Sequence, residues 1–169
     1  MQGKPNKLND ERLPPYMSYR TWQKLLSELS SNNVPSRFDH SYFDNLNITG
    51  SSRSIARGTF QFLGLISNDG LPTQKLHQLV KAEGPARGNT LAEIIRNAYE
   101  PLFSALDVTK GATQSQLREF FKSQGVSGDI ERKCLSFFFA LAADANLTLS
   151  PHLKKPSSRG RGKRAGGND

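Results

Sequence analysis

The sequence is poor in the features that mark several common classes of protein. It has a single cysteine, Cys134, among 169 residues, which excludes an intramolecular disulfide and a cysteine-rich zinc site. No stretch approaches the roughly 18 apolar residues of a membrane span. Residues 1–15 lack the apolar segment of a signal peptide. We therefore expect a soluble protein, without a membrane partner, in the cytoplasm.

Residue patterns for catalysis are also missing. The three histidines, His40, His77 and His152, lie far apart and lack the spacing of paired metal ligands. Cys134 falls on an apolar helix face, which is typical of a small core residue and not of a nucleophile. A phosphate-binding loop that ends in Gly-Lys-Ser or Gly-Lys-Thr does not occur. We predict no enzyme, no cofactor and no metal site.

Positive charge is what the sequence has in excess. Its formal net charge is +8, from 23 lysines and arginines and 15 acidic residues. Residues 154–169 have a net charge of +5 and no large apolar side chain, so we predict a disordered basic tail. Residues 1–13 are also polar and form a predicted disordered arm. The six cations of the tail are Lys154, Lys155, Arg159, Arg161, Lys163 and Arg164.

Between these ends, apolar residues recur at steps of three and four, which is the spacing of buried helix faces. The pattern predicts an all-α fold. Residues 82–90 contain Pro85 and two glycines and read as a linker. The expected helices cover residues 19–29, 39–46, 52–66, 73–80, 91–106 with a kink or a new start at Pro101, 113–121 and 128–141.

The second part of the chain repeats the first at an offset of 75 residues. Seven of thirty aligned positions are identical across residues 44–73. The pattern predicts two helix-turn-helix repeats, residues 14–81 and 91–153, and residues 65–73 and 142–151 are a candidate reduced wing in each. One apolar face, Ile55, Thr59, Phe62, Leu63 and Ile66, corresponds position by position to Ile130, Cys134, Phe137, Phe138 and Leu141.

Three segments give the chain a resemblance to a known family. They are residues 15–22 (PYMSYRTW), the glycine and serines at 50–52 leading into residues 62–66 (FLGLI), and residues 69–73 (DGLPT). Over about residues 14–151 the chain resembles an uncharacterised prokaryotic family, a domain of unknown function with a winged-helix-like appearance. The resemblance implies that fold and no activity.

The predicted helix 52–66 has a polar outer stripe of Arg53, Arg57 and Gln61. Arginine and glutamine are side chains that can bond to base edges, so this stripe is a candidate DNA-reading face. The alternative for Arg57 is a structural ion pair with Asp44, because its counterpart Arg132 would pair in the same way with Glu119. Arg53 and Gln61 lack such a repeated partner and are the better candidates for DNA contact.

The predicted helix 128–141 has a different outer face. Leu135 and Phe139 would point outward, and Asp129 and Glu131 near its start would repel phosphate. We therefore expect this face to dock onto the first repeat or onto a second copy of the chain.

Together these features predict a non-enzymatic protein that binds double-stranded DNA, associated with the nucleoid, with the tail on phosphates. The alternative for the tail is that it only increases solubility and does not contact nucleic acid. The alternative is a helical interaction or homodimerisation module that uses the second repeat. RNA binding is a weaker third option, because most phenylalanines lie on predicted buried faces.

Overall fold

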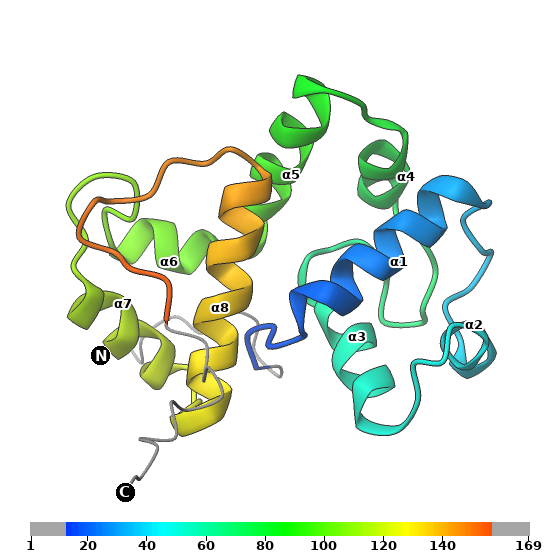
Figure 1. Cartoon of the computed structure of the whole chain (residues 1–169), viewed down its shortest axis with the longest axis horizontal. Helices are drawn as coiled ribbons and strands as arrows, with labels where there is room; N and C mark the ends of the chain where they lie inside the picture. Colours follow the sequence, from blue (N-terminus) through cyan, green and yellow to red (C-terminus); the bar gives the residue numbers. More distant parts are fainter. Residues whose placement is uncertain (1–12, 157–169) are drawn as a thin grey trace, which may run out of the picture.

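The computed structural model describes residues 13–156, which fold into eight α-helices and contain no β-strand (Figure 1). The all-α prediction is therefore confirmed. None of these helices is long and apolar enough to cross a membrane. The helices are α1 (Tyr19–Ser31), α2 (His40–Asn45), α3 (Gly50–Phe62), α4 (Gln74–Lys81), α5 (Pro85–Ala98), α6 (Glu100–Ala105), α7 (Gln114–Ser123) and α8 (Gly128–Asp144).

Side-chain caps fix where three of the helices begin. The Ser18 hydroxyl accepts a hydrogen bond from the backbone N–H of Thr21 at the start of α1. The Asp39 carboxylate does the same for α2. Thr113 and Gln116 form a reciprocal capping box at the start of α7. Each cap satisfies backbone donors that lack an intrahelical partner, which is why these helices start near their predicted positions.

The predicted linker over residues 82–90 is wrong for most of its length. Gly84 adopts φ of +56°, and α5 begins directly after it with Pro85. Proline suits the first turn of a helix because its missing N–H would have no partner there. The Pro and Gly residues that suggested a linker thus form a helix start. Pro101 likewise lies at the beginning of α6, so the expected new start near it is confirmed.

The helix predicted over residues 52–66 ends at Phe62, and a small hairpin follows. Gly64 has φ of +74°, a conformation that glycine adopts at little cost, and it turns the chain away from the helix axis. Ile66 and Pro72 form an antiparallel bridge, closed by a hydrogen bond from the Ser67 N–H to the Leu71 carbonyl at 2.8 Å. The predicted counterpart over residues 142–151 has no such bridge in the described chain, because α8 continues through Asp144.

The residues predicted to form the inner faces are buried or half-buried in both halves, although the rest of the two halves differs. Thr59 and Cys134 are both buried, as are Phe62 and Phe137, while Ile55 and Ile130 are half-buried against the core. The pair α2 and α3 therefore corresponds to the pair α7 and α8. Helix α4 has no helical counterpart, because residues 149–156 form no helix.

The halves share one hydrophobic core. Helices α1–α4 lie on one side and α5–α8 on the other, with α8 next to α1 (Figure 1). The Trp22 ring is fully buried and makes edge contacts with Phe60 of its own half at 5.6 Å and with Phe137 of the other at 5.8 Å. Asp144 on α8 accepts hydrogen bonds from the Tyr19 hydroxyl and from Arg87, the latter at 3.0 Å.

Because Trp22 packs on both halves, its truncation should destabilise them together. We predict that Trp22→Ala lowers the free energy of unfolding by about 3–5 kcal/mol, the usual cost of removing a large buried ring. Urea unfolding followed by circular dichroism measures this change, and Gln23→Ala, at an exposed neighbour on α1, is the control. Two separate transitions in the wild-type protein would contradict a shared core.

Candidate nucleic-acid interface

The α3 stripe of Arg53, Arg57 and Gln61 is half-buried and bonded within its own half. Arg53 Nη1 lies 2.7 Å from Asp44 Oδ1 on α2. Arg57 Nη2 donates to the Asn68 carbonyl at 3.2 Å, and Gln61 Nε2 donates to the same oxygen at 3.4 Å. The stripe therefore attaches α3 to α2 and to the hairpin.

These contacts correct the predicted ion pairs. The partner of Asp44 is Arg53, one helical turn before Arg57, so the residue expected to lack a structural partner has one. In the second half, Arg132 bonds to Asp129 on its own helix and not to Glu119. The two predicted pairs, Arg57 with Asp44 and Arg132 with Glu119, were chosen because both members recur in the repeat. The actual pairing depends on which turn of the helix faces the acidic side chain.

The most exposed residues of α3 are small and uncharged. Ser51, Ser52 and Ser54 are exposed, and Gly58 is half-buried. Such residues allow close approach to another molecule but supply few base-specific contacts.

The outward face assigned to α8 is also corrected. Leu135 is only 3% exposed and belongs to the core, and Phe139 is half-buried beside Phe138. Glu131 is buried too, and its carboxylate accepts a hydrogen bond from Arg118 on α7. Helix α8 is covered over a wide arc because α5 and α7 both pack on it. Homodimerisation stays a prediction, but Leu135 is not a surface residue and cannot take part in its interface.

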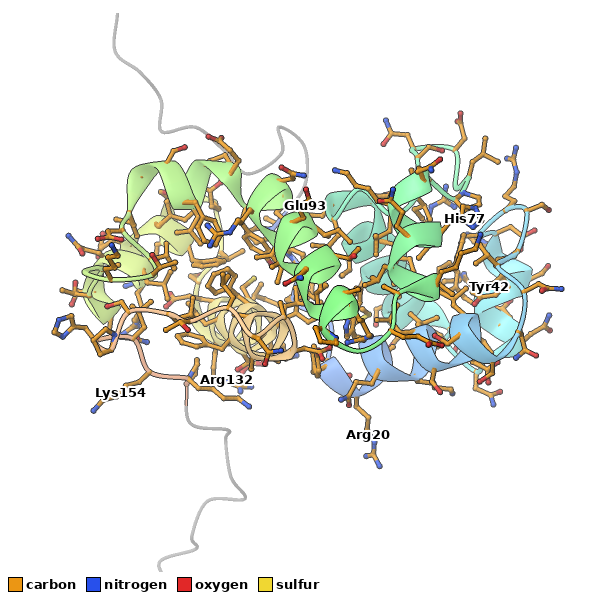
Figure 2. The ribbon with its side chains drawn as sticks, turned by 90° about the horizontal axis from the view of Figure 1, so that it is seen from above. Arg20, Tyr42, His77, Glu93, Arg132 and Lys154 are labelled. Atoms are coloured by element: carbon orange, nitrogen blue, oxygen red, sulfur yellow. The ribbon has the colours of Figure 1, made fainter. Side chains whose placement is uncertain are left out.

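Three cationic side chains from distant parts of the sequence lie on one side of the molecule in the view of Figure 2. Arg20 of α1, Arg132 of α8 and Lys154, which follows α8, project from the same side, whereas His77 lies toward the opposite one (Figure 2). We call the first three the cationic edge. Two hydrogen bonds position Lys154: its N–H donates to Gln114 Oε1 at 2.9 Å, and the Ser150 N–H donates to the Val108 carbonyl at 2.7 Å.

The tail begins at this edge. Lys154 and Lys155 are exposed residues within the described chain. The remaining predicted tail contacts, Arg159, Arg161, Lys163 and Arg164, lie outside the described residues.

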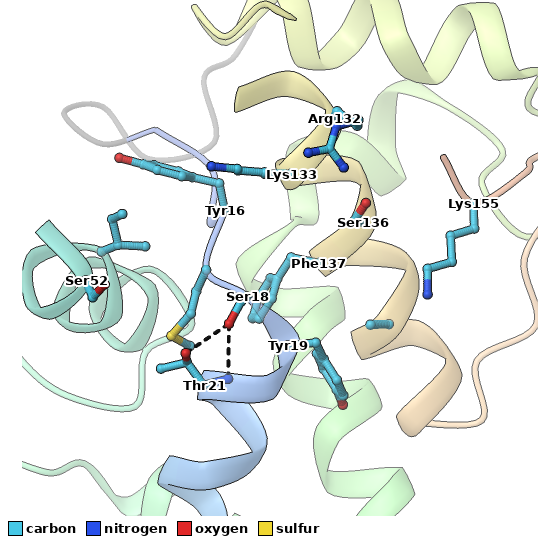
Figure 3. A pocket seen from close by; sticks show the side chains of 13 residues that line it. Tyr16, Ser18, Tyr19, Thr21, Ser52, Arg132, Lys133, Ser136, Phe137 and Lys155 are labelled. Carbon is cyan, nitrogen blue, oxygen red and sulfur yellow. Dashed lines mark hydrogen bonds between the residues drawn. The ribbon is translucent and has the colours of Figure 1, made fainter. Parts of the chain in front are cut away.

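A cleft of about 320 Å³ lies where the two halves meet (Figure 3). Arg132 and Lys133 line it from α8, and Lys155 lines it from the segment that follows. Asp129 holds the first two side chains: Arg132 Nη2 lies 2.8 Å from its Oδ1 and Lys133 Nζ lies 3.4 Å from its Oδ2. Hydrogen bonding from Arg132 lowers the pKa of Asp129, so this carboxylate stays charged and continues to orient both cations.

Sequence reasoning missed Arg20 and Lys133. Arg20 lies within the segment 15–22 that carried the family resemblance. Lys133 follows Asp129 by four residues, a spacing that brings opposite charges together on a helix. Neither signal reveals that Arg20 lies on the same side of the molecule as Arg132 or that Lys133 lines a cleft.

The residues set aside as non-catalytic lie apart from one another. His40, His77 and His152 are each exposed, and residues 13–156 bring no three potential metal ligands together. Cys134 is fully buried, and its thiol donates to the Pro14 carbonyl at 3.5 Å. Burial raises the pKa of this thiol to about 12.

The fold is that of an all-α protein. The chain belongs to DUF5343, a family of unknown function, whose profile matches residues 15–148. No curated protein and no solved structure matches the chain.

The state of Cys134 gives a direct test of the packing of α8. We predict that its thiol does not react with an aromatic disulfide reagent in the native protein at pH 8, because it is buried and protonated. In guanidinium chloride one thiol per chain should react rapidly. Equal rates in the two conditions would show that the N-terminal segment around Pro14 does not cover this side chain.

Proposed function

We propose that the protein is a non-enzymatic DNA-binding protein that contacts the phosphate backbone through its cationic edge. The observation that carries this proposal is the common orientation of Arg20, Arg132 and Lys154, which come from distant parts of the sequence (Figure 2). Phosphate contacts from lysine and arginine supply most of the affinity of sequence-independent DNA binding.

The distribution of charge along the chain supports the same proposal. Four further cations follow the described segment, at Arg159, Arg161, Lys163 and Arg164, and the edge ends where this part of the chain begins. Cations that continue from a positioned edge into a basic segment can follow a phosphate backbone over a longer distance. Specificity for a base sequence is not expected from such contacts.

The order of the first three helices adds a second line of support. A helix, a short helix and a longer helix followed by a hairpin is the order of a winged helix-turn-helix. In such an arrangement α3 would approach the DNA with the exposed serines Ser51, Ser52 and Ser54. The α3 stripe has a structural role in this proposal, because its side chains bond to α2 and to the hairpin.

Single substitutions distinguish the cationic edge from the α3 stripe. We expect Arg20→Ala and Lys154→Ala each to weaken binding to random-sequence duplex DNA and to reduce the salt slope by about 1, as for loss of one phosphate contact. Fluorescence anisotropy over a series of salt concentrations measures both quantities. Lys81→Ala is the control, because it removes an exposed cation from the face of α4 that carries His77.

Arg53→Ala is a second comparison in the same measurement, and we expect it to change DNA binding little. It removes a cation that is paired with Asp44, so its effect on DNA binding should be small. A loss of affinity for Arg53→Ala larger than that for Arg20→Ala would assign the main phosphate contact to the α3 stripe and contradict its assignment to the cationic edge.

Truncation tests the contribution of the tail. A chain that ends at Pro156 lacks four cations, Arg159, Arg161, Lys163 and Arg164. If each neutralises one phosphate, the salt slope should fall by about 3.6, because one contact contributes about 0.9. An unchanged slope would leave the tail with only a solubilising role.

A further inference from the structure

The cleft between the halves is lined by two chemically different sets of residues, which we call its apolar side and its polar side. Its apolar side includes Tyr16 and Ile55, both half-buried, together with Phe137. Its polar side carries the cations Arg132, Lys133 and Lys155. Figure 3 shows Lys133 next to Tyr16, Arg132 beside it on α8, and Lys155 on the other side of the α8 face. A ligand that satisfies both sides needs an anionic group next to a flat apolar group.

The apolar side is largely aromatic. Tyr16 and Tyr19 precede and begin α1, and the Tyr19 and Phe137 rings lie 6.1 Å apart in a tilted arrangement. The Tyr19 hydroxyl bonds to Asp144, which fixes the orientation of that ring. Aromatic rings provide surfaces on which nucleobases stack with little sequence preference.

The polar side has more positive charge than its own carboxylate neutralises. Asp129 is shared by Arg132 and Lys133, and no carboxylate of residues 13–156 forms an ion pair with Lys155. One negative charge thus faces three positive ones. The Ser136 hydroxyl also lines the cleft and can donate a hydrogen bond to an anion, whereas the Ser18 and Thr21 hydroxyls are bonded to each other at 2.9 Å.

The size and position of the cleft narrow the choice of ligand. About 320 Å³ is at the lower end of the volumes of small-molecule sites. Arg132 belongs both to the cleft and to the cationic edge, so a phosphate chain that follows the edge reaches the opening of the cleft. A phosphate joined to a planar base matches the two sides better than a phosphate alone, which would leave the aromatic side unused.

We propose that the cleft binds one nucleotide unit, with its phosphate at Arg132, Lys133 and Lys155 and its base against Tyr16 and Ile55. The unit can come from a single strand or from a free mononucleotide. This site extends the proposed function to unpaired nucleotides and does not require affinity for duplex DNA.

Ser136→Phe tests the site because it fills the cleft without changing any charge. Wild-type and variant proteins are titrated with thymidine 5′-monophosphate by calorimetry and with a labelled oligothymidine of about twelve nucleotides by anisotropy. We expect the variant to lose about tenfold or more in affinity for the probe that the wild type binds, since one stacked base contributes about that factor. Ser115→Phe, at an exposed serine of α7 outside the cleft, is the matched control.

Three further measurements make the outcome decisive. Lys155→Ala should lower the affinity for the same probe without filling the cleft. It therefore tests the site even if Ser136→Phe fails to fold. Inorganic phosphate should compete at least about tenfold more weakly than the mononucleotide, because it lacks the stacked base. Duplex binding should survive in Ser136→Phe, since the edge residues Arg20 and Lys154 are unchanged.

The outcomes separate this site from the proposed function. Binding of the mononucleotide alone, or of the single strand alone, supports the site and identifies the source of the unit. Binding of neither probe, equal affinity in Ser136→Phe, or equal competition by inorganic phosphate overturns it. A wild-type protein that binds the mononucleotide but not duplex DNA would retain the site and reject duplex binding.

Discussion

The contact of Trp22 with Phe60 and Phe137 is the interaction on which the rest of the structure depends. A large ring that packs on both halves makes the inner faces of α3 and α8 parts of one core. Each half alone would expose the apolar face that the other covers, and small domains that bury little surface are marginally stable. Every surface formed by both halves therefore depends on this contact.

The cleft and the cationic edge are such surfaces. The start of α1 approaches α8 because Trp22 is fixed in the core, and Tyr19 and Arg87 then reach Asp144 from α1 and α5. The same approach places the hydroxyls of α1 opposite the cations of α8. The proposed binding therefore depends on the packing, because without the shared core Arg20 and Arg132 would have no fixed position relative to each other.

The charges divide into those that maintain the fold and those directed outward. Arg53, Arg57, Arg87 and Arg132 bond to groups within the protein. Isolated ion pairs at a surface contribute little to stability, about 0–1 kcal/mol each, so these contacts chiefly set orientation. Arg20 and Lys154 project from the same side and are the cations to which we assign the proposed DNA contact. A formal net charge of +8 therefore says less about binding than the positions of a few cations.

The amino-acid sequence by itself determined the helical class, most helix starts and the inner faces, because these follow from local periodicity and from caps such as Ser18, Asp39 and Thr113. Glycine and proline near residue 85 were ambiguous, since the same residues end a loop and begin a helix. Only the tertiary structure decided that Leu135 is buried, that Arg53 pairs with Asp44, and that α1, α8 and the segment at Lys155 enclose a cleft. The physical reason is that periodicity defines one face of a helix, whereas the packing of neighbouring helices decides how far burial extends around it and which distant charges meet.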